Sequence, residues 1–183
     1  MLNRNSDLDI KSNYSLEKLN TFGLDVASES FYIVKSLKNL RNILSDHKTK
    51  EITVLGGGSN ILFTKFLHGL CLKIDLKGID IIEENENEVV VNIMAGENWH
   101  DFVLWSVNNG FGGIENLSLI PGYVGAAPIQ NIGAYGVELK DVFMSCKTIN
   151  IKDQTEKEFN EKDCLFGYRT SRFKSIDKNI YII

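Results

Sequence analysis

Residues 52–60 read ITVLGGGSN, an apolar run that passes directly into three consecutive glycines. The apolar residues are typical of a buried strand. Because glycine has no Cβ and accepts positive φ angles, the backbone that follows can present successive N–H groups to an anion. This combination suits a pyrophosphate, although a simple hairpin turn would use the same residue types. The predicted phosphate-binding residues are Gly56, Gly57, Gly58, Ser59 and Asn60.

The spacing does not fit the two commonest nucleotide-binding motifs. A P-loop needs a Gly-Lys-Ser/Thr sequence, which does not follow here. A dinucleotide-binding G-x-G-x-x-G motif needs a glycine where Ile61 stands. It also needs a helix where the apolar, strand-like residues 61–63 stand.

Regular elements are predicted on both sides of this loop. Residues 31–34 and 70–76 have the composition of strands, and Ser36 is placed to cap a helix. The apolar positions of that helix recur at helical spacing, at Leu37, Leu40, Ile43 and Leu44. Residues 1–14 are polar, and we expect this N-terminal segment to be loose.

Two hairpins and a second helix are predicted further along the chain. The first hairpin pairs residues 79–82 with 89–94 across an acidic tip, and the second pairs 142–151 with 157–159. Asn98 is placed to open the helix. The predicted buried face of this helix consists of Trp99, Phe102, Val103 and Val107.

This order of strands and helices is an α+β pattern rather than a series of βαβ repeats. A shift in composition divides the chain into two lobes, residues 15–76 and residues 77–183. With 183 residues, 43% hydrophobic side chains and a net charge of −4, the chain has the balance of a globular protein. A disordered chain is excluded because such chains lack enough apolar surface to bury.

Other classes of protein and site are also disfavoured. The apolar runs are too short for a membrane span, and the N-terminal residues lack the apolar core of a signal peptide, so we expect a cytoplasmic protein. Cys71, Cys146 and Cys164 are far apart, which favours buried reduced thiols over a disulfide or a zinc cluster. The three histidines share no metal-ligand spacing, and we expect no metal site.

A second unusual segment, residues 120–136, reads IPGYVGAAPIQNIGAYG. It holds both prolines of the chain, four glycines and three alanines, and it carries no charged side chain. An exposed flexible loop would be polar, whereas this one is stiff and apolar enough to be buried. Its small residues and free backbone N–H groups, flanked by Gln130 and Asn131, fit a flat ligand lying against the main chain. A tightly packed structural loop is the alternative.

A third motif, residues 166–174, reads FGYRTSRFK and interleaves aromatic with basic side chains. Nucleic-acid binding is disfavoured because the chain is acidic overall and has no broad basic stripe. An arginine beside a tyrosine can instead hold a carboxylate through paired hydrogen bonds.

In this order, the three motifs closely resemble the UDP-N-acetylenolpyruvoylglucosamine reductase family. These flavoenzymes, also called UDP-N-acetylmuramate dehydrogenases, serve bacterial peptidoglycan synthesis. The resemblance also includes NTFG at residues 20–23 and GENW at residues 96–99, and it runs from about residue 20 to the last residue. It implies a two-lobed FAD-binding fold of the vanillyl-alcohol-oxidase (PCMH) type.

The resemblance implies a role for each motif. The glycine loop, residues 56–60, would hold the pyrophosphate of a non-covalent FAD, and residues 121–136 would wrap the rest of the cofactor. NADPH would reduce the flavin, which passes a hydride to the enolpyruvyl group of a UDP-sugar. Arg169 matches the family's catalytic arginine, with Tyr168 helping to orient it. The cofactor-binding residues implied in the second loop are Pro121, Gly122, Gly125, Ala126, Gln130, Asn131, Gly133, Ala134 and Gly136.

One part of the family's pattern has no counterpart in this sequence. The proton-donating serine and its assisting glutamate belong to a third, C-terminal substrate-binding domain, and no residue here maps onto them. We therefore expect a truncated FAD-binding part whose apolar end at Ile183 interrupts a strand. The alternatives are a non-catalytic flavin-binding module and an FAD oxidase that shares only the cofactor fold.

Overall fold

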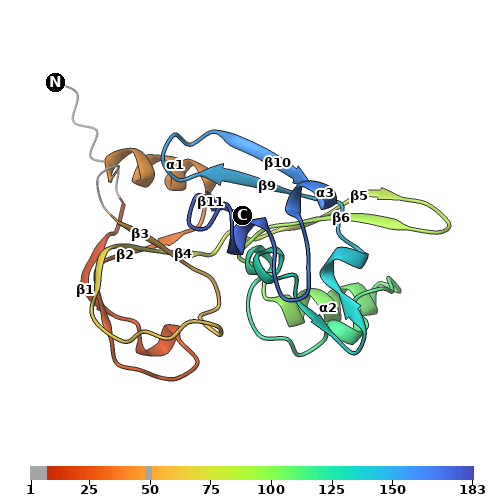
Figure 1. The fold of residues 1–183 in the computed structure, drawn as a ribbon, viewed down its shortest axis with the longest axis horizontal. Helices are drawn as coiled ribbons and strands as arrows, with labels where there is room; N and C mark the ends of the chain where they lie inside the picture. The colour runs from red at the N-terminus through yellow and green to blue at the C-terminus, as the bar shows by residue number, and fades with distance from the viewer. Residues whose placement is uncertain (1–7, 48–50) are drawn as a thin grey trace. The chain divides into compact units, whose positions relative to one another are not determined.

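The computed structural model describes residues 8–47 and 51–183. The chain divides into two compact units, Met1–Leu76 and Lys77–Ile183, called unit 1 and unit 2 below (Figure 1). Each unit is described by itself.

Unit 1 is built on a four-stranded sheet with the strand order β1-β2-β4-β3. Its strands are β1 (Lys11–Ser15), β2 (Ala27–Val34), β3 (Ile52–Leu55) and β4 (Leu67–Ile74). β4 is parallel to both of its neighbours, and β1 is antiparallel to β2. The three strands predicted in this region are confirmed, although β2 and β4 begin earlier than predicted.

The prediction that residues 1–14 are loose is wrong from Lys11 onward, because these residues belong to β1. Lys11 pairs with Phe31, and Tyr14 pairs with Ser28, across β1 and β2. β1 is an edge strand with mostly exposed, polar side chains, so its own residues carry no hydrophobic alternation. Only its pairing with β2 makes it a strand. Residues 1–7 of that prediction lie outside the described residues.

The helix α1 (Leu37–Asp46) begins as predicted after Ser36, whose Oγ accepts a hydrogen bond from the N–H of Asn39 at 3.2 Å. Leu37 is 43% exposed and does not belong to the buried face, which consists of Leu40, Ile43 and Leu44. Residues 61–63 form no strand, but Phe63 is buried. The hydrophobic cluster around it contains Leu16, Phe31, Leu55, Phe63 and Cys71.

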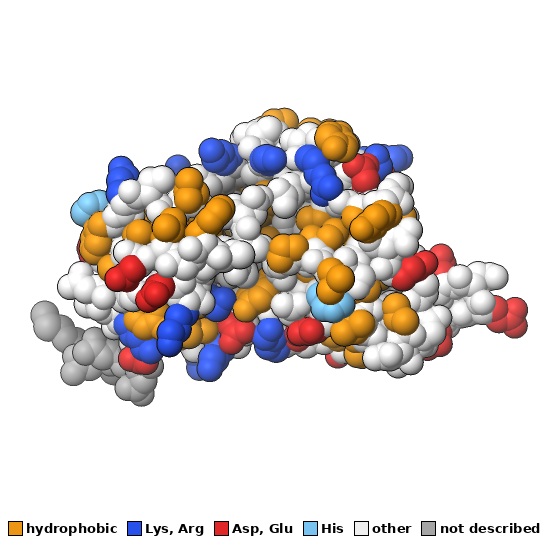
Figure 2. Space-filling view, turned by 90° about the horizontal axis from the view of Figure 1, so that it is seen from below, with side chains coloured by type: hydrophobic (Ala, Val, Ile, Leu, Met, Phe, Trp, Pro, Cys, Tyr) orange, Lys and Arg blue, Asp and Glu red, His pale blue; other side chains and the backbone are white. Residues whose placement is uncertain are grey.

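Unit 2 starts with the predicted antiparallel hairpin of β5 (Ile79–Glu84) and β6 (Val89–Ile93). Figure 2 shows acidic side chains gathered at the projecting end of this hairpin. A second sheet has the order β10-β9-β11. Its strands are β9 (Ser145–Asn150), β10 (Glu156–Asn160) and β11 (Tyr181–Ile182), with the short helix α3 (Glu161–Cys164) directly after β10. The second predicted hairpin corresponds to β9 and β10 and is confirmed.

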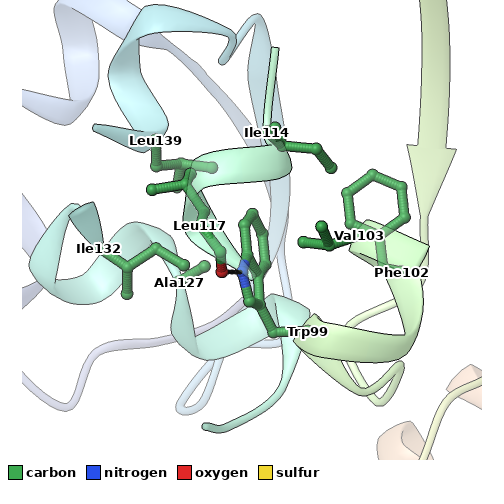
Figure 3. Close-up of a cluster of buried hydrophobic side chains, with 8 residues drawn as sticks. All are labelled: Trp99, Phe102, Val103, Ile114, Leu117, Ala127, Ile132 and Leu139. Carbon is green, nitrogen blue, oxygen red and sulfur yellow. Dashed lines mark hydrogen bonds between the residues drawn. The ribbon is translucent and has the colours of Figure 1, made fainter. Parts of the chain in front are cut away.

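The helix α2 (Trp99–Asn108) is capped by Asn98 as predicted, because the Oδ1 of Asn98 accepts a hydrogen bond from the N–H of Asp101. Val107 is 49% exposed, so its predicted burial is wrong, and Ser106 is buried in its place. The indole Nε1 of Trp99 donates to the carbonyl of Leu117 at 2.8 Å (Figure 3). The cluster around this bond contains Trp99, Phe102, Val103, Ile114, Leu117, Ala127, Ile132 and Leu139.

Between α2 and β9 the chain forms short 3-10 turns and two very short strands, β7 (Gly133–Ala134) and β8 (Val137–Glu138). Two residues of the predicted loop 120–136, Ala127 and Ile132, are in the core of unit 2 (Figure 3). The three cysteines are buried and free of disulfides. No helix within the described residues is both long and apolar enough to cross a membrane.

Candidate functional site

The glycine loop directly follows β3 in unit 1, and two of its carbonyl groups accept hydrogen bonds from other segments of the unit. The carbonyl of Gly56 accepts a hydrogen bond from Nζ of Lys73 at 3.1 Å. The carbonyl of Gly58 accepts one from the N–H of Thr21 at 3.2 Å. Gly58 has a φ of +72°, and a Cβ there would lie 1.9 Å from the carbonyl oxygen of Leu19. The close approach of the two segments therefore requires glycine at this position.

Three N–H groups of the same loop differ from these carbonyls, because they have no hydrogen-bond partner among the described residues. Within residues 8–47 and 51–183, the N–H groups of Gly57, Gly58 and Ser59 donate no hydrogen bond. Gly58 is buried and the other two are half-buried. Successive unpaired N–H groups form a concave site for an anion, and Lys73 places a positive charge beside Gly56. These residues therefore fit a phosphate group.

Two residues that help to hold this loop in place were not among the predicted site residues. Asn20 is buried, and its side chain donates to the carbonyls of Leu16 and Leu24 at 2.8 and 3.0 Å, which shapes the turn that reaches Gly58. Lys73 is the other. The available signal was that it is the only charged residue within the apolar run 70–74.

The first half of the loop 120–136 is packed against residues 95–99 of the same unit. The N–H of Gly125 donates to the carbonyl of Ala95 at 2.9 Å, and the carbonyl of Gly122 accepts from the N–H of Trp99 at 3.0 Å. A Cβ at Gly125 would lie 2.6 Å from the Cβ of Ala95. The expectation of free N–H groups along this loop is therefore wrong at Gly125, where the glycine allows two segments to pack.

Asn131 connects this loop to the third sequence motif. Its side chain is fully buried, and its Nδ2 donates to the carbonyl of Gly167 at 3.1 Å. Its Oδ1 accepts from the N–H of Lys140, also at 3.1 Å. Close by in sequence, the carbonyl of Ile129 accepts from the Oγ of Ser171 at 2.7 Å. Both polar ends of the Asn131 side chain are therefore used by the protein itself.

Two tight turns meet at this connection, and we call them the paired turns (residues 133–138 and 167–170). In the first, β7 and β8 pair across Tyr135 and Gly136, whose φ angles are +51° and +82°. In the second, Gly167 and Thr170 exchange both backbone hydrogen bonds, at 3.1 and 3.2 Å. Arg169, at the second central position, has a φ of +53°.

The paired turns border an open pocket of about 420 Å³. The guanidinium Nη2 of Arg169 donates to the carbonyl of Gly133, which fixes one turn to the other. The carboxylate of Glu138 lies 2.6 Å from Nζ of Lys140. The pocket is lined by Gly133, Ala134, Tyr135, Gly136, Val137, Glu138, Lys140, Asp141, Tyr168 and Arg169.

The structure thus brings some of the predicted site residues together and leaves others apart. The predicted catalytic residues Arg169 and Tyr168 line one pocket with the predicted cofactor residues Gly133, Ala134 and Gly136. Tyr135 and Lys140 line it as well and were not predicted. The predicted residues of the loop 120–136 that lie outside its lining are Pro121, Gly122, Gly125, Ala126, Gln130 and Asn131, and the glycine loop, residues 56–60, is outside it as well.

Two ionisable side chains outside the pocket, those of His100 and Cys71, contribute to the packing and hydrogen bonding of the fold. Nδ1 of His100 accepts a hydrogen bond from the N–H of Leu119 at 3.2 Å. In the part of the chain that the structure describes, no group of three or more His, Cys, Asp or Glu side chains could hold a metal ion. Burial raises the pKa of the Cys71 thiol to about 12. This thiol is therefore protonated at neutral pH.

The chain is similar to a known domain family and to known proteins. Residues 29–157 match the family of the FAD binding domain. The chain is 51% identical over 176 residues to the UDP-N-acetylenolpyruvoylglucosamine reductase of Flavobacterium johnsoniae, covering 96% of this chain and 52% of that protein. It is 48% identical over 179 residues to the reductase of the same name from Amoebophilus asiaticus, with the same coverage. The chain spans about half the length of these curated relatives.

Solved structures show the same fold. The crystal structure of UDP-N-acetylenolpyruvylglucosamine reductase from Thermus caldophilus matches with a TM-score of 0.68 and 21% identity, over 90% of this chain and 56% of that one. A structure of alkyldihydroxyacetonephosphate synthase matches with a TM-score of 0.55 and 14% identity, over 76% of this chain and 27% of that one. At these identities the likeness concerns the fold alone.

Proposed function

This chain belongs to the FAD binding domain family, and from that premise we propose that it binds FAD as the flavin-binding part of a UDP-N-acetylenolpyruvoylglucosamine reductase. The observation that carries the proposal is which backbone groups of the glycine loop are hydrogen-bonded and which are not. Its carbonyls are held at Gly56 and Gly58, while three successive N–H groups have no partner among the described residues. Such a loop is suited to the pyrophosphate of FAD.

The protein's residues would divide the binding of FAD between them. The glycine loop would hold the pyrophosphate, with Lys73 balancing its charge. Gly133, Ala134 and Gly136 would contact another part of the cofactor, because they line the pocket of unit 2. The attachment would be non-covalent, since the glycine loop contains no histidine or cysteine.

In the proposed reaction Arg169 would stabilise negative charge. Bound FAD would supply the hydride chemistry, taking hydride from NADPH and delivering it to the enolpyruvyl double bond of the UDP-sugar. Arg169 lines the pocket with its guanidinium fixed to the carbonyl of Gly133, and a fixed cation stabilises the charge that develops on the substrate carboxylate. Tyr168 precedes Arg169 in the same turn and would help to orient it.

The proton that completes the reduction is assigned to no residue of this chain, because no serine or glutamate here maps onto the family's proton donor. The full reduction is therefore proposed for a protein in which these residues form the flavin-binding part. A cytoplasmic location stays a prediction from the sequence.

FAD binding can be tested on this chain directly. We expect the purified chain to take up FAD, seen as visible flavin absorbance. Lys73→Met keeps most of the apolar stem but removes the charge, and we expect it to raise the Kd for FAD about tenfold, which is about 1.4 kcal/mol. Lys38→Met, an exposed position on α1, is the matched control and should leave the Kd unchanged. A folded chain that takes up no FAD would contradict the proposal.

A test of the role of Arg169 requires a turnover assay with NADPH and the enolpyruvyl sugar nucleotide. The protein assayed is the reductase of which this chain is proposed to be the flavin-binding part. We expect Arg169→Lys to lower kcat by about 100-fold while flavin is retained, because lysine lacks the planar fork that fixes the charge. Unchanged turnover would remove this assignment.

A further inference from the structure

Arg169 has a backbone conformation that its residue type does not favour. It stands at the second central position of the turn 167–170 with a φ of +53°. When φ is positive at this position, glycine or asparagine is the usual residue. A larger residue is strained there and persists only where the surrounding structure imposes the conformation. The groups that hold this turn therefore decide where the guanidinium of Arg169 lies.

Two side chains hold the turn at Arg169 and before it. Nδ2 of Asn131 donates to the carbonyl of Gly167 at 3.1 Å, and Nζ of Lys174 donates to the carbonyl of Arg169 at 3.0 Å. Lys174 is exposed, so water competes for its bond and the net stabilisation is small. Asn131 is buried, but its bond acts two residues before Arg169. Neither bond fixes the segment that follows Arg169.

That segment is held by Ser171, which lies directly after the turn and is 1% exposed. Its Oγ donates to the carbonyl of Ile129 at 2.7 Å and accepts a hydrogen bond from the N–H of Phe173 at 3.1 Å. The buried ring of Phe173 packs against Phe159, with the ring centroids 5.2 Å apart. Buried hydrogen bonds of this kind are costly to leave unmade. The hydroxyl of Ser171 therefore connects a segment anchored in the core of unit 2 to the loop 120–136.

This connection sets the position of Arg169 relative to the loop. Ile129 belongs to the loop 120–136, and Ser171 lies two residues after Arg169. The guanidinium of Arg169 reaches back to the carbonyl of Gly133 in the same loop. A cation stabilises developing charge best when it is fixed before the reaction, and a small misplacement of such a group is costly. The Ser171 hydroxyl is therefore placed to control where this charge lies.

We propose that Ser171 is a positioning residue for Arg169 and acts through its hydrogen bond to the carbonyl of Ile129. This inference rests on the proposed function, in which Arg169 stabilises negative charge on the substrate carboxylate. Ser171 is buried and is not among the residues that line the pocket, so its hydroxyl acts through Arg169 and not on the substrate. Loss of this hydroxyl slows the reduction and leaves the flavin bound.

The test is a double-mutant cycle in the reductase used to assay Arg169. Ser171→Ala should lower kcat by about 10- to 100-fold, the cost of a small misplacement of a catalytic group, with little change in the KM for NADPH. In the Arg169→Lys background the same change should lower kcat by less than about twofold, because the guanidinium that Ser171 positions is absent. Equal losses in the two backgrounds would overturn the inference.

The matched control is Ser106→Ala. Ser106 is 5% exposed, its Oγ donates to the carbonyl of Phe111 at 2.9 Å, and it is not among the residues that line the pocket. Both alanine variants should lower the Tm of this chain by about 2 to 4 °C, whereas only Ser171→Ala should lower kcat in the reductase. Ser171→Thr keeps the hydroxyl and should recover most of the turnover. A similar loss of kcat in Ser106→Ala, or a folded Ser171→Thr variant as slow as Ser171→Ala, would contradict the positioning role.

Flavin absorbance and the Arg169 variant separate this inference from the proposed function. If Ser171→Ala releases FAD and the enzyme that keeps its flavin has an unchanged kcat, the inference falls and the proposed function stands. If Arg169→Lys alone leaves turnover unchanged, the inference falls together with the role of Arg169, while FAD binding stands. If the folded chain takes up no FAD, both proposals fall.

Discussion

The glycine loop of unit 1 and the paired turns of unit 2 share an unusual backbone conformation, a positive φ angle, but different kinds of residue adopt it. In the glycine loop the positive φ belongs to Gly58, and the groups left unpaired are main-chain N–H groups. In and beside the paired turns, positive φ angles occur at Gly136 and at three residues with larger side chains, Asn131, Tyr135 and Arg169. The glycine loop therefore leaves backbone N–H groups unpaired, whereas the paired turns hold side chains at positions that carry a conformational cost.

The largest effect is expected at Gly58, where the comparison predicts that no side chain is tolerated. Gly58→Ala would place a Cβ 1.9 Å from the Leu19 carbonyl as well as impose a left-handed alanine. We expect the free energy of unfolding to fall by about 3 kcal/mol or more. The measurement is urea unfolding of the purified variant.

Gly110→Ala is the matched control, because Gly110 has a φ of +79° and a Cβ there would meet nothing within 4 Å. Only the backbone term remains, so we expect a loss of about 1 kcal/mol. Equal losses at Gly58 and Gly110 would show that the Leu19 contact does not matter and would break the comparison.

An intermediate effect is expected at Asn131, where the comparison predicts that glycine is worse than the native residue. Asn131→Gly relaxes the backbone but leaves the buried carbonyl of Gly167 and the N–H of Lys140 without their partners. We expect a loss of about 2 kcal/mol in urea unfolding. Asn179→Gly, at an exposed position with a φ of +61°, should change stability by less than about 0.5 kcal/mol. A stabilised Asn131→Gly variant would mean that the side chain has no supporting role.

At neutral pH the smallest effect concerns Cys71, which tests whether this side chain inside unit 1 only packs. Its thiol has a pKa raised by burial from 9.0 to about 12. Stability is therefore fully present below pH 9.0 and declines toward about pH 12, because the unfolded thiol ionises first. Relative to Cys71→Ala, the unaltered chain should lose about 1.4 kcal/mol of its free energy of unfolding per pH unit between pH 9.0 and about pH 12. Rapid alkylation of Cys71 in the folded protein at neutral pH would instead indicate a reactive thiol.

The sequence-based prediction of the fold succeeded where a local pattern had one meaning. The strand before the glycine loop, the two hairpins and the caps at Ser36 and Asn98 all depend on residues close together in sequence. The prediction failed at Lys11–Ser15, because an exposed edge strand has no alternation of its own and forms only by pairing with β2. It also failed at Val107, because helical spacing alone does not define how wide the buried face of α2 is.

The candidate site divides in the same way. The glycine loop could be singled out from the sequence because three glycines directly after an apolar run are a local pattern. The pocket could not, because its lining joins residues 133–141 with Tyr168 and Arg169 through the bond from Arg169 to Gly133. Tyr135 was missed as a pocket residue because the pocket forms only where this bond joins the two turns. Nothing in the neighbouring sequence distinguishes it from a tyrosine in any other turn.

The sequence by itself determined the order of elements, the glycine loop and the small, apolar composition of residues 120–136, because glycine, proline and hydrophobic spacing act over a few residues. Only the tertiary structure decided which groups are free. It paired the Gly58 carbonyl with Thr21, used the N–H of Gly125 for packing and buried the side chain of Asn131. It left the N–H groups of residues 57–59 unpaired within the described chain. The physical reason is that a hydrogen bond or a steric contact between distant segments depends on where both partners lie.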